Sequence, residues 1–169
     1  MKKLFAVSLI LLLVACAGYS GKGLVVGESG MDDVIRVMGE PRMRWVDADG
    51  TRHLAYPRGP SGVHTYMARI GVDGKLQHIE NVMDPLTLGR IKAGMSKDQV
   101  LRILGPSDPS GTAYFKARDE LVWEWLYCDE WSKLSHFDVL FDGTSGSVRS
   151  TISVRVNCGP RDDDCECAR

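Results

Sequence analysis

The sequence has neither an excess of charge of one sign nor a long apolar segment. Its 169 residues contain 21 Lys and Arg against 22 Asp and Glu, a formal net charge of -1. Nucleic-acid binding depends on a concentrated positive field, so we expect no nucleic acid as partner. Eighteen glycines and seven prolines favour short strands and tight turns over a helical bundle. The length allows one domain, or two half-size units that share a core.

The spacings that identify common active sites are also missing. The four histidines form no His-x-x-x-His or His-Glu-x-x-His pattern, and each falls on an expected strand. They are His53, His64, His78 and His136. There is no Gly-x-Ser-x-Gly elbow and no glycine-rich phosphate loop between a strand and a helix. We therefore expect no enzyme, no catalytic residue, no metal ligand, no cofactor and no small-molecule substrate.

The N-terminus has the features of an export signal. Two lysines precede an apolar run over residues 4–15, which is too short to span the ~30 Å core of a bilayer. The run ends in Leu-Val-Ala-Cys at residues 13–16, which resembles a bacterial lipobox with Cys16 as the lipidated residue. Cleavage after Ala17 by an ordinary signal peptidase is the alternative. The resemblance implies a signal peptide over 1–15 and an anchor and flexible tether over 16–23. With Ala17 after the cysteine, it also implies an outer-membrane location facing the periplasm.

A repeat organises the remaining chain. Residues 32–39 match residues 98–105 at an offset of 66, with an apolar stripe at helical spacing in both copies. Ser29 with Asp32, and Ser96 with Gln99, are the expected N-terminal capping pairs. A glycine and a proline follow each segment, which predicts two short helices that both end at the glycine.

Strand patterns separated by turns follow each predicted helix, and Asp-Gly hairpins occur in both halves. We therefore predict an α+β fold with one unit over 24–83 and a second over 84–156, followed by a tail rich in Cys and Asp over 157–169. An extra helix is expected over 86–91. Neither half would bury its sheet well alone, so we expect the two sheets to join into one larger curved sheet with helices on one side.

The second unit resembles a known family. Its Gly-Met-Ser-x-x-x-Val-x-x-x-Leu-Gly-Pro pattern over 94–106, followed by aromatic strands, is similar to the SmpA/OmlA (BamE-like) family of outer-membrane lipoproteins. The resemblance implies two helices before an antiparallel sheet and a role with the β-barrel assembly machinery or in envelope integrity. Tandem copies also resemble the β-lactamase inhibitory protein. That resemblance implies the alternative function, an inhibitor-like binder of a periplasmic enzyme that uses a concave sheet.

Four cysteines remain beyond Cys16, and in an oxidising compartment they favour disulfides. Cys128 ends a predicted strand and Cys158 follows the last one, so this pair is our first choice among the three possible pairings. Cys165 and Cys167 are left unassigned. Their Cys-x-Cys spacing is poor for zinc.

Two positions are candidate contacts for a partner protein. Trp123, Trp125 and Tyr127 alternate along one strand and are expected in the core beneath helices. Trp131 follows them in a predicted turn, where an exposed indole favours binding. Arg58 lies in the Pro- and Gly-rich loop 57–62, where it has no evident structural role. The expected partner is a protein, with the membrane reached through the lipid.

Overall fold

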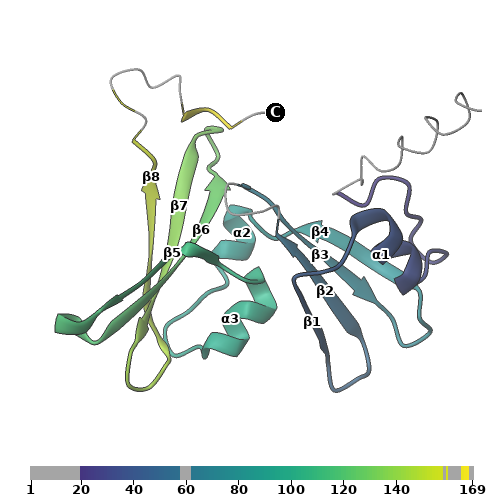
Figure 1. Ribbon diagram of the computed structural model, residues 1–169, viewed down its shortest axis with the longest axis horizontal. Coiled ribbons are helices and arrows are strands. Elements are labelled where there is room, and N and C mark those ends of the chain that lie inside the picture. The colour runs from purple at the N-terminus through teal and green to yellow at the C-terminus, as the bar shows by residue number, and fades with distance from the viewer. Residues whose placement is uncertain (1–19, 58–61, 158, 160–164, 168–169) are drawn as a thin grey trace, which may run out of the picture.

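The computed structural model describes residues 20–57, 62–157, 159 and 165–167 (Figure 1). Within these residues, eight strands form two separate four-stranded antiparallel sheets, each in sequential strand order. The first sheet contains β1 (Met43–Val46), β2 (Arg52–Pro57), β3 (Thr65–Ile70) and β4 (Leu76–Asn81). The second contains β5 (Asp108–Phe115), β6 (Glu120–Cys128), β7 (Leu134–Asp142) and β8 (Val148–Arg155). The fold class is α+β, as the sequence predicted.

The two helices of the repeat are present at the predicted spacing. α1 (Met31–Met38) and α3 (Lys97–Leu104) have eight residues each and begin 66 positions apart. The extra helix α2 (Pro85–Leu88) is a single turn, shorter than predicted, and a short 3₁₀ helix (Lys116–Arg118) joins β5 to β6. No helix in the described part of the chain is long and apolar enough to cross a membrane.

Capping agrees with the prediction at α3 and differs at α1. The Ser96 hydroxyl accepts a hydrogen bond from the Gln99 N–H, and the Gln99 side chain accepts one from the Ser96 N–H, over 3.2 and 2.8 Å. At α1 the predicted pair of Ser29 with Asp32 is wrong. The N-cap is Gly30, whose N–H donates to Asp33 Oδ2 over 2.9 Å. The Ser29 hydroxyl instead accepts a hydrogen bond from the Val25 N–H in the preceding turn. The helix therefore starts one residue later than predicted.

The elements stack in alternating layers (Figure 1). α1 covers the outer face of the first sheet, while α2 and α3 lie between the two sheets. On β2, Leu54 and Tyr56 pack with α1, whereas Ala55 packs with the second half of the chain. The alternation of side chains along a strand therefore gives the first sheet two buried faces.

The prediction of one continuous curved sheet with helices on a single side is wrong. The strands form two sheets that share no hydrogen-bonded pair among the described strands. The physical reason is that apolar side chains of α3 pack in a core that both sheets share. Val100 and Leu104 lie in one core with Ala55 and Met67 of the first sheet and Trp125 and Val139 of the second. The two sheets therefore pack face to face through α3, and their edge strands do not pair with each other.

A polar and aromatic network also holds α3 on the first sheet. His53 Nε2 lies 2.7 Å from Asp47 Oδ2, and Arg102 Nη1 of α3 lies 3.2 Å from Asp47 Oδ1. Trp45 stacks on His53 at 4.8 Å, with the Arg102 guanidinium 5.9 Å from the Trp45 ring centre. Asp47 thus joins side chains from both halves of the molecule.

The aromatic strand β6 lies as predicted. Trp125 and Tyr127 are buried in the shared core, and Trp123 is partly buried against it with an edge contact to Phe141. Upstream, residues 1–19, which include Cys16 and the first half of the predicted anchor and tether, lie outside the described residues. The tether ends earlier than predicted, because Gly21 is buried against Ile79 of the first sheet.

The two helix-ending glycines provide a matched test of how closely α3 packs on the first sheet. Gly39 and Gly105 both have positive φ, 84° and 72°, so Gly→Ala strains both backbones by about 1–3 kcal/mol. A Cβ on Gly39 would meet nothing within 4 Å, whereas one on Gly105 would lie 3.0 Å from the buried Thr65 side chain. We expect Gly105→Ala to lower the free energy of unfolding by at least about 1 kcal/mol more than Gly39→Ala in urea denaturation. Equal losses would contradict this packing.

Candidate interaction site

The hairpin turn between β6 and β7 is held by one carboxylate. Asp129 Oδ1 accepts hydrogen bonds from the backbone N–H groups of Trp131 and Lys133, both over 2.9 Å. The Ser132 N–H donates to the Asp129 carbonyl at 2.9 Å, and Ser132 has a φ of 59°. These bonds close the turn tightly, so its side chains project from a fixed backbone.

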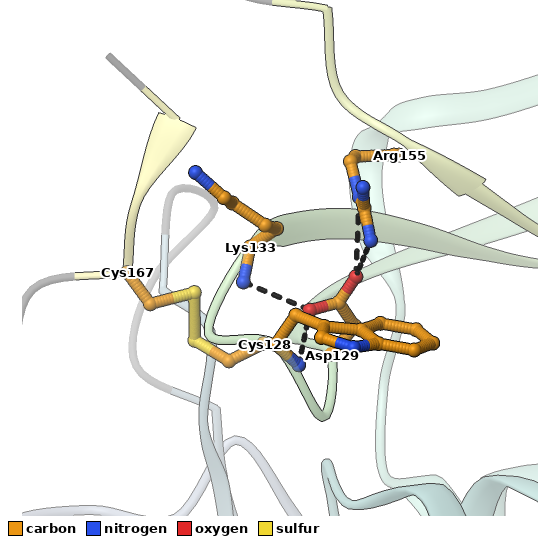
Figure 2. The surroundings of a disulfide bond; sticks show 6 residues. Cys128, Asp129, Lys133, Arg155 and Cys167 are labelled. Atoms are coloured by element: carbon orange, nitrogen blue, oxygen red, sulfur yellow. Dashed lines mark hydrogen bonds and ion pairs between the residues drawn. A yellow bond between two sulfur atoms is a disulfide. The ribbon is translucent and has the colours of Figure 1, made fainter. Parts of the chain in front are cut away.

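The other carboxylate oxygen of Asp129 ties the turn to the neighbouring edge strand. Arg155 of β8 donates to Asp129 Oδ2 through Nη2 at 2.9 Å and through Nε at 3.2 Å (Figure 2). Burial raises the pKa of Asp129, but the Lys133 backbone N–H and the Arg155 side chain outweigh it, so the pKa is lowered overall. The carboxylate remains charged and keeps the turn closed at neutral pH.

Trp131 lies on this rigid turn as the sequence predicted. Its side chain is 66% exposed, and the Arg155 guanidinium lies 5.5 Å from its ring centre. A hollow of about 350 Å³ adjoins it, bordered by residues of α2, β6, β7 and β8 and of the turn. An exposed indole on a backbone that is already ordered loses little conformational entropy when a partner binds.

A disulfide joins the start of the turn to the C-terminal tail, but not through the predicted cysteine. Cys128 is bonded to Cys167, with their Cα atoms 6.0 Å apart (Figure 2). The prediction of Cys128 with Cys158 is therefore wrong, and Cys158 itself lies outside the described residues. The tail is brought to the hairpin because the Cys167 N–H donates to the Ser132 carbonyl and Glu166 bridges to Lys133. Cys165 is disulfide-bonded as well.

The remaining predicted site residues fall elsewhere. Cys16, the expected lipid attachment, and Arg58, the second candidate contact, both lie outside the described residues. His53, His78 and His136 are on strands β2, β4 and β7, while His64 precedes β3. In the part of the chain that the structure describes, no group of three or more His, Cys, Asp or Glu side chains is placed to hold a metal ion.

The structure also brings together a row of acidic residues that the sequence did not reveal. In the strand register, Asp108 of β5 is opposite Glu124 of β6, and Glu124 is opposite Asp138 of β7. His136 Nδ1 lies 3.0 Å from Glu124 Oε2, at ion-pair distance but outside hydrogen-bond geometry. Burial raises the pKa of both Glu124 and Asp138, against the opposing effect of His136. Only the strand register could have predicted this row, because its members are far apart in the sequence.

With this geometry, the chain is an α+β protein whose second sheet ends in a rigid hairpin bearing an exposed tryptophan. No family model and no curated protein matches its sequence. Among solved structures, it is similar to an extracellular protein containing a SCP domain from Bacillus anthracis str. Ames, at 10% identity and a TM-score of 0.29. The match covers 78% of this chain and 44% of that one. A likeness at this score carries no argument about fold or function.

Removing the disulfide tests what the tail contributes. The bond closes a loop with a sequence separation of 39, which corresponds to about 4 kcal/mol in the chain-entropy model. We expect the double variant Cys128→Ser, Cys167→Ser to lose about that much in urea unfolding. Peptide mapping without reduction should recover a linked Cys128–Cys167 peptide. A peptide linking Cys128 to Cys158 would contradict the assignment.

Two aspartates of β7 should respond to pH in opposite directions. Burial raises the pKa of Asp138 in the folded protein. At pH values above about 3.8, the pKa of this carboxyl in the unfolded chain, its charge therefore destabilises the fold. The pKa of Asp142 is lowered to about 2 by hydrogen bonds from the Ser145 backbone and from Arg149, so its charge stabilises the fold there. We therefore expect Asp138→Asn to raise the urea midpoint at pH 7 and Asp142→Asn to lower it.

The pH dependence provides the control for both variants. The gain from Asp138→Asn should vanish at pH 3, where that carboxyl is protonated in folded and unfolded chains alike. The loss from Asp142→Asn should shrink as the pH falls toward 2. If both variants changed the urea midpoint in the same direction at pH 7, these assignments would be contradicted.

Proposed function

We propose that this chain is a non-catalytic, lipid-anchored protein of the outer membrane that faces the periplasm and binds other proteins. Its partners are subunits of the β-barrel assembly machinery, or proteins that maintain envelope integrity. The observation that carries the proposal is the exposed Trp131 on a turn ordered by Asp129, Arg155 and a disulfide. A rigid indole beside a hollow is typical of a binding hot spot.

Two further observations support the location and the class. A disulfide is stable in an oxidising compartment such as the periplasm, which agrees with an export signal over residues 1–15. The repeated helix-and-sheet units agree with the SmpA/OmlA resemblance in their local order, helix before antiparallel strands. The inhibitor-like alternative depends on one concave sheet across both halves. Because the sheets are separate, the hairpin carries the proposal instead.

The test is capture of partners by the full-length tagged chain from mildly solubilised, briefly crosslinked envelopes, followed by mass spectrometry. We expect recovery of barrel-assembly subunits, reduced at least tenfold by Trp131→Ala, which corresponds to about 1.4 kcal/mol. Val72→Ala is the matched control. Val72 lies on the β3–β4 turn and is 70% exposed, similar to Trp131, and its removal should leave recovery unchanged.

A third variant tests the anchor. Cys16→Ser should release the chain from the membrane fraction, and the intact mass of the wild-type chain should show acyl groups on a mature N-terminus at Cys16. An unmodified mature chain that starts at Gly18 would contradict lipidation. Absence of all barrel-assembly subunits from the capture, together with normal detergent resistance of a deletion strain, would contradict the assembly and integrity roles.

A further inference from the structure

The last strand of the second sheet, β8, has one open edge. β7 pairs with one side of it, and no other strand in the described part of the chain pairs with the other side. Where β8 begins, the Val148 N–H donates to the Met95 carbonyl and the Gly94 N–H donates to the Val148 carbonyl. Every residue of β8 after Val148 is exposed. The open edge therefore runs over residues 149–155, where another strand can reach the backbone.

The strand register determines which backbone groups face this edge. The Val156 N–H donates to the carbonyl of Leu134, the residue directly opposite it, over 2.9 Å. In an antiparallel pair, residues bonded to the neighbouring strand alternate with residues whose N–H and carbonyl point away from it. Thr151, Ser153 and Arg155 are of the second kind, and within the described chain their backbone groups form no hydrogen bond. A row of free donors and acceptors thus faces the open edge.

The other three edges of the described sheets have features that hinder pairing with another chain. β1 has only four residues. The start of β4 is hydrogen-bonded to residues 27–29, and further along it carries the exposed charged pair of His78 and Glu80. β5 contains Pro109, and its register with β6 is irregular. By contrast, residues 150–154 of β8 are Ser-Thr-Ile-Ser-Val, with no charge, no proline and a regular register.

The side chains of this edge are complementary to those of a second copy. Ile152 and Val154 lie two residues apart on the same face of β8 and are 46% and 49% exposed. If two copies of β8 pair antiparallel about Ser153, Ile152 of each copy lies opposite Val154 of the other. Branched apolar side chains in such pairs stabilise a sheet. The same register brings the free backbone groups of residues 151, 153 and 155 opposite one another, so they can bond across the dimer.

The charges at the two ends of the strand favour the same register. Arg149 and Arg155 each form an ion pair with an aspartate of their own chain. Pairing about Ile152 would place Arg149 of one copy opposite Arg155 of the other, and like charges directly opposite destabilise a sheet. Pairing about Ser153 places Arg155 opposite Thr151 instead. The neutral centre of the edge also offers no attraction to a charged partner strand.

We propose that two copies of this chain associate through β8, antiparallel about Ser153, so that their second sheets form one eight-stranded sheet across the dimer. One strand edge covers less surface than the about 1,200–2,000 Å² of a stable interface, so we expect a weak dimer with a Kd of about 10–100 µM. This self-association goes beyond the proposed function and does not depend on it.

The test measures the mass of the full-length chain in density-matched detergent micelles by sedimentation equilibrium over a range of concentrations. We expect a monomer–dimer equilibrium. The double variant Ile152→Lys, Val154→Lys places like charges opposite each other in both halves of the interface, so it should weaken the dimer at least about tenfold. Val46→Lys is the matched control. Val46 lies on the edge strand β1 and is 58% exposed, and this variant should leave the dimer unchanged.

A charge-swap variant tests the register. Ile152→Lys combined with Val154→Glu in one chain places each lysine opposite a glutamate of the other copy. We expect this variant to dimerise with a Kd within about threefold of the wild-type value. In a register about Ile152, the two lysines would face each other instead. A swap variant as weak as the double-lysine variant would overturn the pairing about Ser153.

Amide hydrogen exchange shows whether the edge itself is covered and whether the variants fold. The N–H groups of Thr151 and Ser153 should exchange fast in dilute chain and more slowly as the concentration rises, because they gain acceptors only in the dimer. The Ile152 N–H, which points toward β7, should be protected at every concentration and in every folded variant. Slow exchange at Thr151 and Ser153 in the monomer would show that the edge is already paired, and it would overturn the proposal.

Two further outcomes would also overturn it. One is a chain that remains monomeric at about 500 µM, well above the expected Kd. The other is protection of the Thr151 and Ser153 amides only when a different protein is added, which would assign the edge to that protein. Trp131→Ala should leave the dimer intact. Failure of envelope capture with an intact dimer would contradict only the proposed partners, and a monomeric chain with intact capture would contradict only the self-association.

Discussion

The burial of α3 between two sheets is the constraint on which the rest of the structure depends. Each four-stranded sheet must bury at least one face, and the described helices that could cover these faces are short. α3 contributes to two sheets at once because its apolar side chains belong to a core drawn from both. Gly105 makes this approach possible, since a side chain there would meet Thr65.

The two repeats show how the same local signals lead to different surroundings. α1 and α3 have the same length, the same glycine ending and a similar apolar stripe. α1 covers one face of the first sheet and has nothing beyond it among the described elements, whereas α3 has a sheet on each side (Figure 1). The difference arises from tertiary packing, because helix caps and periodicity are determined within a few residues.

This division explains what the sequence could and could not predict. Both repeat helices, the Ser96 cap, the buried aromatic strand and the exposed Trp131 depend on neighbours close in sequence, and these predictions were confirmed. The separation of the sheets, the row of carboxylates at Glu124 and Asp138, and the pairing of Cys128 depend on contacts between distant segments. Cys158 was the first choice because it follows the last strand, but it is Cys167 that lies beside the hairpin, where its N–H donates to the Ser132 carbonyl.

The candidate binding surface on the hairpin follows from the same packing. The hairpin of β6 and β7 extends past the helices, so its turn projects Trp131 outward and must be ordered by its own bonds to Asp129. The disulfide to Cys167 and the ion pair with Arg155 hold the same turn, so three independent links fix the backbone that presents the indole.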